Sequence, residues 1–107
     1  MTDSLTHLST KFGKEVQVVE TNWPLACPNP KYPFPVDQRD IPFTPSGQWD
    51  YLKRLANTLK VIPKATGLNY WESAWVNNAV LGSSCEYNVM FDPSGKACDS
   101  LSVFNYL

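Results

Sequence analysis

A glutamate that follows a short β-branched run is the residue of this sequence with the clearest potential for chemistry. The run Val16-Gln17-Val18-Val19 is typical of a buried strand, and Glu20 comes directly after it, three residues before Trp23. A carboxylate at the carboxyl end of a strand has the rigid support that a catalytic group needs. The alternative is a solvated charge at a strand end, and this segment alone does not decide between the two.

A second segment ends in a similar way. Leu68-Asn69-Tyr70-Trp71, introduced by Gly67, predicts another short strand, and Glu72 and Trp75 follow it. Trp71 could form an apolar platform for the face of a sugar, or it could pack in a core, since Trp is highly buried on average. Glu72 is a poor candidate for a catalytic carboxyl beside Trp71, because neighbouring residues on a strand point in opposite directions.

Three helices and a stiff loop are expected to position these segments. Leu5, Leu8 and Phe12 have helical spacing and predict a helix that ends at Gly13. Seven of the nine prolines lie from Pro24 to Pro45, which predicts a long ordered loop.

A second helix follows that loop, with Thr44 or Ser46 as its N-cap and Pro63 after its end. Its apolar stripe is formed by Trp49, Leu52, Leu55, Ala56 and Leu59. After the second strand, a loop rich in Gly, Ser and Asn leads to a closing helix that contains Ala97, Leu101 and Phe104.

This alternation of helices and strands is typical of βα units with a parallel sheet, in which functional groups gather beyond the carboxyl ends of the strands. Two parallel strands alone would leave open edges and uncovered apolar faces. A closed barrel of such units needs about 250 residues, and this chain has 107. The sequence therefore predicts part of a larger α/β fold.

Composition excludes several functions. Nine basic and ten acidic side chains give a net charge of -1, and the basic ones are dispersed, which argues against a nucleic-acid partner. The sequence has no uninterrupted apolar stretch of about 18 residues, so no membrane span is expected, and no signal peptide is expected at Met1. His7 is the only histidine, so neither a metal site nor a Ser-His-Asp triad is predicted, and no cofactor or protein partner is expected.

Four separated motifs, in order and with matching spacing, resemble a known family: Val18-Val19-Glu20-Thr21-Asn22-Trp23-Pro24, Cys27-Pro28-Asn29-Pro30, Tyr70-Trp71-Glu72-Ser73-Ala74-Trp75 and Leu81-Gly82-Ser83-Ser84-Cys85. They closely resemble the fungal arabinogalactan endo-β-1,4-galactanases of glycoside hydrolase family 53, over essentially all 107 residues. The resemblance implies the C-terminal part of a (β/α)8 TIM barrel, comprising helix six, strand seven, helix seven, strand eight and helix eight. Residues 1–107 would then be a partial glycoside hydrolase catalytic domain.

The resemblance also implies roles for individual residues. Glu20 matches the nucleophile of a retaining mechanism that hydrolyses β-1,4-galactan, in which a second carboxyl about 5 to 5.5 Å away protonates the leaving oxygen. In the family, that acid/base glutamate ends strand four, which this chain lacks, so the chain alone is expected to be inactive. Trp71 is the expected sugar platform, and Trp75, Asn22 and Trp23 are expected to line the cleft.

The sequence has three cysteines, so one of them stays free if the other two form a disulfide. The resemblance suggests a disulfide between Cys27 and Cys85, which ties two loops and fits a secreted parent enzyme, with Cys98 left free. The alternative is three reduced thiols in a cytosolic chain. The relatives are exported, so an extracellular location is expected for the parent family.

Two other functions stay open at this stage. A small carbohydrate-binding module could use exposed Trp23, Trp71 and Trp75 without catalysis, which the size and aromatic content favour. The βα order argues against it, because many such modules are β-sandwiches. A truncated gene product with no function of its own is the third alternative.

Overall fold

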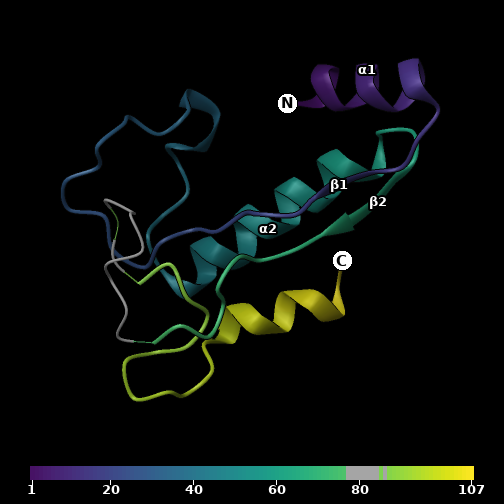
Figure 1. Cartoon of the computed structure of the whole chain (residues 1–107). Coiled ribbons are helices and arrows are strands. Elements are labelled where there is room, and N and C mark those ends of the chain that lie inside the picture. The colour runs from purple at the N-terminus through teal and green to yellow at the C-terminus, as the bar shows by residue number, and fades with distance from the viewer. Residues whose placement is uncertain (77–84, 86) are drawn as a thin grey trace.

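The computed structural model describes residues 1–76, 85 and 87–107, and the motif residues Leu81–Ser84 lie outside this part of the chain. The element order confirms the expected succession of helix, strand, loop, helix and strand (Figure 1). The elements are α1 (Thr2–Phe12), β1 (Val16–Val18), the 3-10 helix η1 (Val36–Gln38), α2 (Pro45–Lys60), β2 (Ala65–Leu68) and the 3-10 helix η2 (Asp99–Asn105).

The two strands pair in parallel, as predicted, and α2 forms the crossover between them. Val16 lies opposite Ala65 and Val18 opposite Leu68, with an irregularity after Val16. The pairing continues past the strand ends, because the Asn69 N–H donates to the Val18 carbonyl at 2.9 Å. The segments that follow β1 and β2 therefore leave the sheet side by side.

The second strand begins earlier than the sequence predicts, at Ala65 instead of Leu68. The sequence predicts that Gly67 introduces the strand, but Gly67 lies within it, opposite Gln17. A Cβ at this position would lie 3.1 Å from the Gln17 side-chain amide carbon, so the absence of a side chain lets Gln17 lie across the strand. Trp71 consequently lies beyond the strand.

Helix α2 provides the main packing surface. The Thr44 side chain caps it by accepting from the Gly47 N–H at 3.1 Å, and Pro45 occupies the first turn, where a missing N–H costs nothing. Its buried face contacts Val16, Val18 and Leu68 of the strands through Leu55, Leu59 and the nearby Ile62. A second cluster joins α2 to η2 through Leu52, Met90 and Val103.

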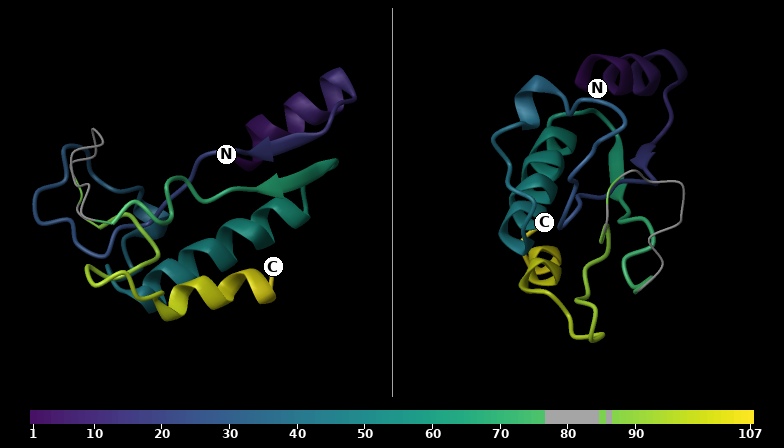
Figure 2. Two further views of the ribbon diagram at one scale, coloured as in Figure 1. Left: turned by 60° about the horizontal axis from the view of Figure 1, so that its bottom comes forward. Right: turned by 90° about the vertical axis from the view of Figure 1, so that its left-hand side faces the viewer.

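Helices α2 and η2 both lie on one side of the strand pair. In Figure 2, α2 and η2 run together beneath β1 and β2, while α1 lies near the amino end of β1. Among the described residues, no helix covers the opposite face of the strands, where Val19 is 62% exposed. One face of this small sheet is thus open. No helix in the described ranges is long and apolar enough to cross a membrane.

Candidate active site at the carboxyl ends of the strands

The structure brings the Glu20 segment and the Trp71 segment together. The Trp71 N–H donates to the Thr21 carbonyl at 2.9 Å, so the residue next to Glu20 is paired directly with Trp71. The Thr21 hydroxyl is hydrogen-bonded to the Tyr51 hydroxyl of α2 at 2.6 Å, which directs Thr21 towards the helix layer. Glu20 itself is exposed, and Asn22 is half-buried on the same segment.

A surface pocket of about 500 Å³ lies at this end of the strands. Its lining is formed by Tyr70, Trp71, Glu72, Ser73, Ala74 and Trp75. Trp71 is 47% exposed and Trp75 is 41% exposed, so both indoles have accessible surface. A flat, rigid ring of this kind can hold the apolar face of a sugar at low entropic cost.

Glu72 lies in a turn and not on a strand, so the argument from strand alternation does not apply to it. Its φ of 50° is in the left-handed region, which costs a non-glycine residue on the order of 1 to 3 kcal/mol. Two backbone hydrogen bonds hold the turn, from Trp75 N–H to the Glu72 carbonyl at 3.3 Å and from Met90 N–H to the Ser73 carbonyl at 2.7 Å. The turn sets the position of the pocket wall.

The expectation that Trp23 lines the cleft is wrong. Trp23 is a core residue that is only 2% exposed. Its indole N–H donates to the Pro42 carbonyl at 3.0 Å, and its ring stacks on Tyr51 with centroids 4.9 Å apart. Phe34 and Phe43 cover it further. The ring therefore has no face to offer a ligand, and it instead anchors the proline-rich loop to α2.

A buried polar cluster, formed by Gln48, Tyr70 and Ser100, lies beneath the site and was not predicted. The Gln48 amide is fully buried and donates to the carbonyls of Trp23 at 2.8 Å and Val89 at 2.9 Å. Its oxygen accepts from the Ser100 hydroxyl at 2.7 Å. The sequence contains one indication of this cluster. Gln48 is a polar residue that stands four residues before Leu52, on the apolar stripe of α2.

Tyr70 extends the polar cluster. Its hydroxyl accepts from the Trp23 N–H at 3.1 Å and lies 2.8 Å from the Asn88 carbonyl, to which it donates. Burial raises the pKa of the Tyr70 phenol above its ordinary value, because the low-dielectric surroundings disfavour the phenolate. The group is thus a neutral structural hydrogen-bonding group and not an acid or base.

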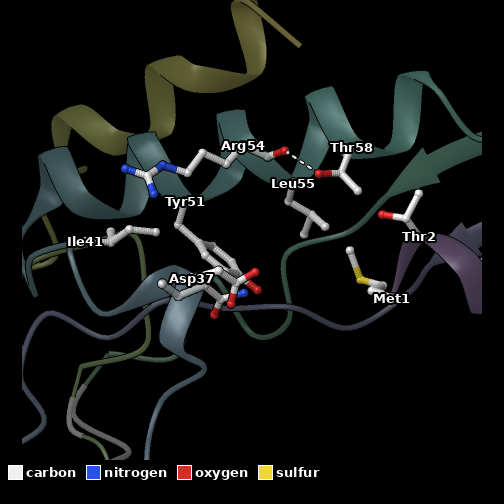
Figure 3. Close-up of a pocket in the computed structure, with 9 residues that line it drawn as sticks. Met1, Thr2, Asp37, Ile41, Tyr51, Arg54, Leu55 and Thr58 are labelled. Atoms are coloured by element: carbon white, nitrogen blue, oxygen red, sulfur yellow. Dashed lines mark hydrogen bonds between the residues drawn. The ribbon is translucent and has the colours of Figure 1, made fainter.

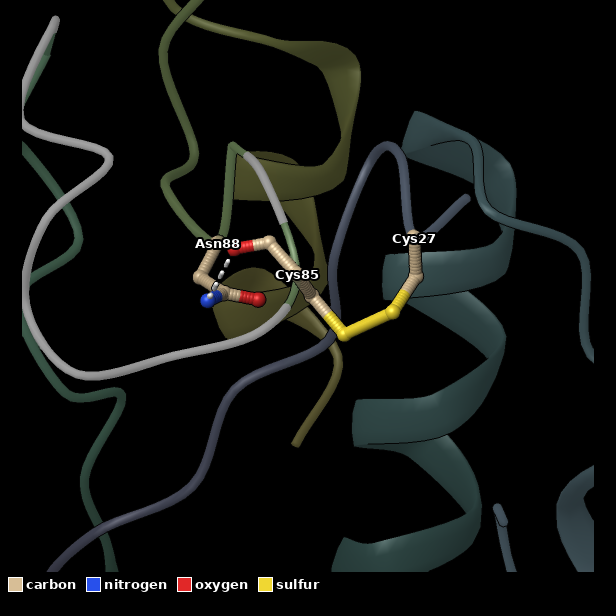
Figure 4. Close-up of a disulfide and its surroundings, with 3 residues drawn as sticks. All are labelled: Cys27, Cys85 and Asn88. Atoms are coloured by element: carbon tan, nitrogen blue, oxygen red, sulfur yellow. Dashed lines mark hydrogen bonds between the residues drawn. A yellow bond between two sulfur atoms is a disulfide. The ribbon is translucent and has the colours of Figure 1, made fainter. Parts of the chain in front are cut away.

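A disulfide joins Cys27, in the loop after β1, to Cys85, in the loop after β2, with the sulfur atoms 2.10 Å apart (Figure 4). The two cysteines are 58 residues apart in the sequence. Cys98 is the free, half-buried thiol among the described residues. The bridge ties together the two loops that leave the carboxyl ends of the strands.

A second pocket, of about 240 Å³, lies between the start of α1, η1 and α2 (Figure 3). Arg54 lines it and forms salt bridges with Asp40 at 2.7 Å and Asp50 at 2.8 Å. The Arg54 guanidinium hydrogen-bonded to Asp40 lowers the pKa of that carboxyl. These charges satisfy one another at the surface, and the arrangement is structural. The described residues contain no group of three or more metal-ligating side chains.

The chain is similar to known proteins over nearly all of its length. The family model described as Glycosyl hydrolase family 53 matches residues 1–104. An arabinogalactan endo-beta-1,4-galactanase from Humicola insolens is 54% identical over 102 residues, which is 95% of this chain and 31% of the relative. The enzyme of the same name from Thermothelomyces thermophilus is 52% identical over 101 residues, or 94% of this chain and 30% of the relative.

The fold also matches a solved structure. A chain from a structural study of two fungal beta-1,4-galactanases superimposes with a TM-score of 0.96 and 52% identity. The match covers 99% of this chain and 32% of that one. The chain thus spans about a third of the length of the proteins that it matches.

Proposed function

The chain belongs to glycosyl hydrolase family 53, and from that membership we propose that it carries the nucleophile half of an endo-β-1,4-galactanase active site. The observation that carries the proposal is the hydrogen bond between Trp71 and Thr21, which brings the Glu20 and Trp71 segments to one end of the sheet. The substrate of the complete enzyme would be the β-1,4-galactan of arabinogalactan, as the names of the relatives indicate.

The likeness to the solved galactanase structure supports a place for the chain in the complete enzyme. In this proposal β1 and β2 are strands seven and eight of a (β/α)8 barrel, and α1, α2 and η2 are its helices six, seven and eight. The open face of the strands supports the assignment, because the interior of such a barrel is filled by side chains from all of its strands. The disulfide supports an extracellular location for the complete protein.

Glu20 would act as the nucleophile of a retaining mechanism. Its ionised carboxylate attacks the anomeric carbon while a second carboxyl protonates the departing sugar oxygen, which leaves a covalent glycosyl ester on Glu20. Water then attacks the same carbon, the second carboxyl takes the proton of that water, and the Glu20 carboxylate is released. The second carboxyl would come from strand four, so residues 1–107 alone are expected not to turn over galactan.

The sugar would be held by the two exposed indoles of the 500 Å³ pocket, Trp71 and Trp75, and by the Glu20 segment. Trp71 and Trp75 have the exposed ring surface that stacking on a galactose face requires. Asn22, two residues after Glu20, would contribute a polar contact.

A chimera tests this proposal. The 102 residues that align with the Humicola insolens enzyme would replace the matching segment of that enzyme, and release of reducing ends from β-1,4-galactan would be measured. Glu20→Gln keeps the size of the side chain but removes the nucleophile, so we expect a loss of at least ~10³-fold in kcat. Glu15→Gln is the matched control, because Glu15 is exposed just before β1, at the other end of the strand.

Full activity in the Glu20→Gln chimera would overturn the assignment of the nucleophile. A folded parent chimera without any activity on galactan would overturn the proposed function itself. Circular dichroism of each variant establishes that it is folded.

The exposure of Trp71 and Trp75 around one pocket also favours the second candidate, a non-catalytic carbohydrate-binding module. The test is binding of galacto-oligosaccharides to residues 1–107 by calorimetry. A module would bind without hydrolysis, lose affinity in Trp71→Ala and be unaffected by Glu20→Gln.

A further inference from the structure

The polar cluster of Gln48, Tyr70 and Ser100 is the part of the described interior that the proposed chemistry does not use. Every hydrogen-bonding group of the Gln48 side chain has a partner, since the amide donates to two carbonyls and its oxygen accepts from Ser100. Among the described residues, no buried side-chain nitrogen or oxygen atom is without a hydrogen-bond partner. A fully satisfied buried network of this kind specifies one arrangement of the segments that it joins.

The segments that it joins are distant in sequence and adjacent to the site. Gln48 lies on α2, 25 residues from Trp23 and 41 residues from Val89 along the chain. Tyr70 bonds to the backbone of Trp23 and of Asn88, 47 and 18 residues away. In the sequence, Trp23 follows Glu20 by three residues, and Tyr70 immediately precedes Trp71. The polar cluster therefore connects the backbone that carries the carboxylate to the backbone that carries the exposed indole.

We propose that Gln48 and Tyr70 are positioning residues, which fix the Glu20 segment relative to the Trp71 segment through the Trp23 backbone. As far as catalysis is concerned, this inference rests on the proposed function. Neither side chain is assigned a contact with the sugar. A shift of about 1 Å in the position of a catalytic group can cost on the order of 100-fold in rate. Because Trp23 is only three residues from Glu20, a displacement of the Trp23 backbone should displace the Glu20 carboxylate and lower the rate.

The first test is independent of activity and uses the 107-residue chain. Tyr70→Phe removes only the hydroxyl that accepts from the Trp23 N–H, and Gln48→Met replaces the amide by an apolar side chain of similar length. By NMR, we expect amide hydrogen exchange of Trp23 to rise about tenfold in each variant. The Val16 amide, bonded to Lys64 at the other end of the strands, reports the general loss of stability, and the rise at Trp23 should exceed any rise at Val16.

Two further variants make this test specific. Tyr106→Phe is the matched control for Tyr70→Phe, because Tyr106 is 61% exposed, and its exchange profile should equal that of the parent chain. Ser100→Ala removes only the donor to the Gln48 oxygen and should raise Trp23 exchange less than Gln48→Met does. If Gln48→Met fails to fold, Ser100→Ala and Tyr70→Phe still decide the question.

The second test uses the galactanase chimera described above. Tyr70→Phe and Gln48→Met should lower kcat by about tenfold to 100-fold, with a smaller change in KM, at a temperature where each variant is fully folded. A purely structural role would leave kcat of the folded fraction unchanged.

The outcomes separate the two proposals. Unchanged exchange at Trp23 in Tyr70→Phe and Gln48→Met would overturn the positioning role whatever the chimera does. Increased exchange together with an unaltered kcat would overturn its catalytic consequence. Increased exchange in a chain whose parent chimera is inactive would support the positioning role and overturn the proposed function.

Discussion

Trp23 and Trp71 each follow one of the paired strands, but their rings lie in opposite surroundings. Trp23 has a hydrogen-bond acceptor for its indole, the Pro42 carbonyl, and three aromatic neighbours around its ring. Trp71 uses its backbone N–H to pair with Thr21 and leaves nearly half of its surface in solvent. The first side chain contributes to stability, and the second is available for a ligand.

Alanine substitutions should separate these two contributions. Trp23→Ala removes a buried aromatic side chain and should lower the free energy of unfolding by about 3 to 5 kcal/mol, measured by urea denaturation. Trp71→Ala should change stability by much less and reduce galacto-oligosaccharide binding, measured by calorimetry. A Trp71→Ala chain that binds as well as the parent would contradict the proposed platform.

The phenol of Tyr70 should make the fold sensitive to alkaline pH. Its pKa is raised in the folded state by burial, so the fold favours the neutral form. The stabilisation is fully present below the unfolded-state pKa of about 10, and it is lost as the pH rises above that value, towards the folded-state pKa. We expect the free energy of unfolding to fall between pH 9 and about pH 11, and the fall to be smaller in Tyr70→Phe.

The reference measurement is at pH 8, where Tyr70→Phe should already be about 1 to 3 kcal/mol less stable because it leaves the Trp23 N–H without its acceptor. Tyr106→Phe should show the same alkaline decrease as the parent chain, since this side chain is exposed. An equal decrease in Tyr70→Phe and the parent would show that Tyr70 does not cause it.

At the level of helices, strands and loops, the sequence predicts what depends on local pattern. The apolar stripe of α2 and its Thr44 cap confirm the expected helix. The β-branched run after Lys14 forms β1 as expected, but the strand ends at Val18, and Val16 and Val18 are half-buried instead of fully buried. The predicted start of β2 is wrong. Glycine disrupts most strands, but Gly67 lies within β2 under the Gln17 side chain, and that contact depends on the pairing of the two strands. The positions of Trp23 and Gln48 depend on hydrogen bonds between residues 19 and 25 positions apart, from Trp23 to Pro42 and from Gln48 to Trp23, which local patterns do not contain.

The disulfide should be a major source of stability for the two loops at the carboxyl ends of the strands. Closing a loop between cysteines 58 residues apart restricts the unfolded chain by about 4 kcal/mol in the chain-entropy model. Cys27→Ala should therefore lower the free energy of unfolding by several kcal/mol under oxidising conditions. The control is Cys98→Ala, which removes the free thiol and leaves the bridge intact.

Reduction provides the complementary measurement. The parent chain should lose the same stability on treatment with dithiothreitol, and the Cys27→Ala chain should lose nothing further. A parent chain with equal stability in both redox states would contradict this account.

At the scale of the whole molecule, the important feature is that the helices within residues 1–76, 85 and 87–107 cover only one face of the strand pair. Val19 is exposed on the segment that follows β1, and parallel sheets are rarely stable with a face uncovered. We expect residues 1–107 in isolation to associate with one another, because open strand edges and apolar faces pair readily between copies.

A charge on that segment should reduce the association. Val19→Lys should shift sedimentation profiles towards the monomer at a given concentration. Val61→Lys is the matched control, because Val61 is 73% exposed at the end of α2, outside the strand pair, and it should leave association unchanged. A parent chain that is monomeric and unfolds in one sharp transition would contradict the expectation.

The link between Cys27 and Cys85 also changes what a protease can do to this molecule. Lys31 is exposed in the proline-rich loop, inside the ring of chain that the two sulfurs close. Tryptic cleavage after Lys31 would break the backbone but release no fragment, since α2 and β2 stay covalently attached to the N-terminal piece through the sulfurs. A chain cleaved once in this way would gain only the mass of one water, and the two pieces would separate only when a reductant broke the disulfide.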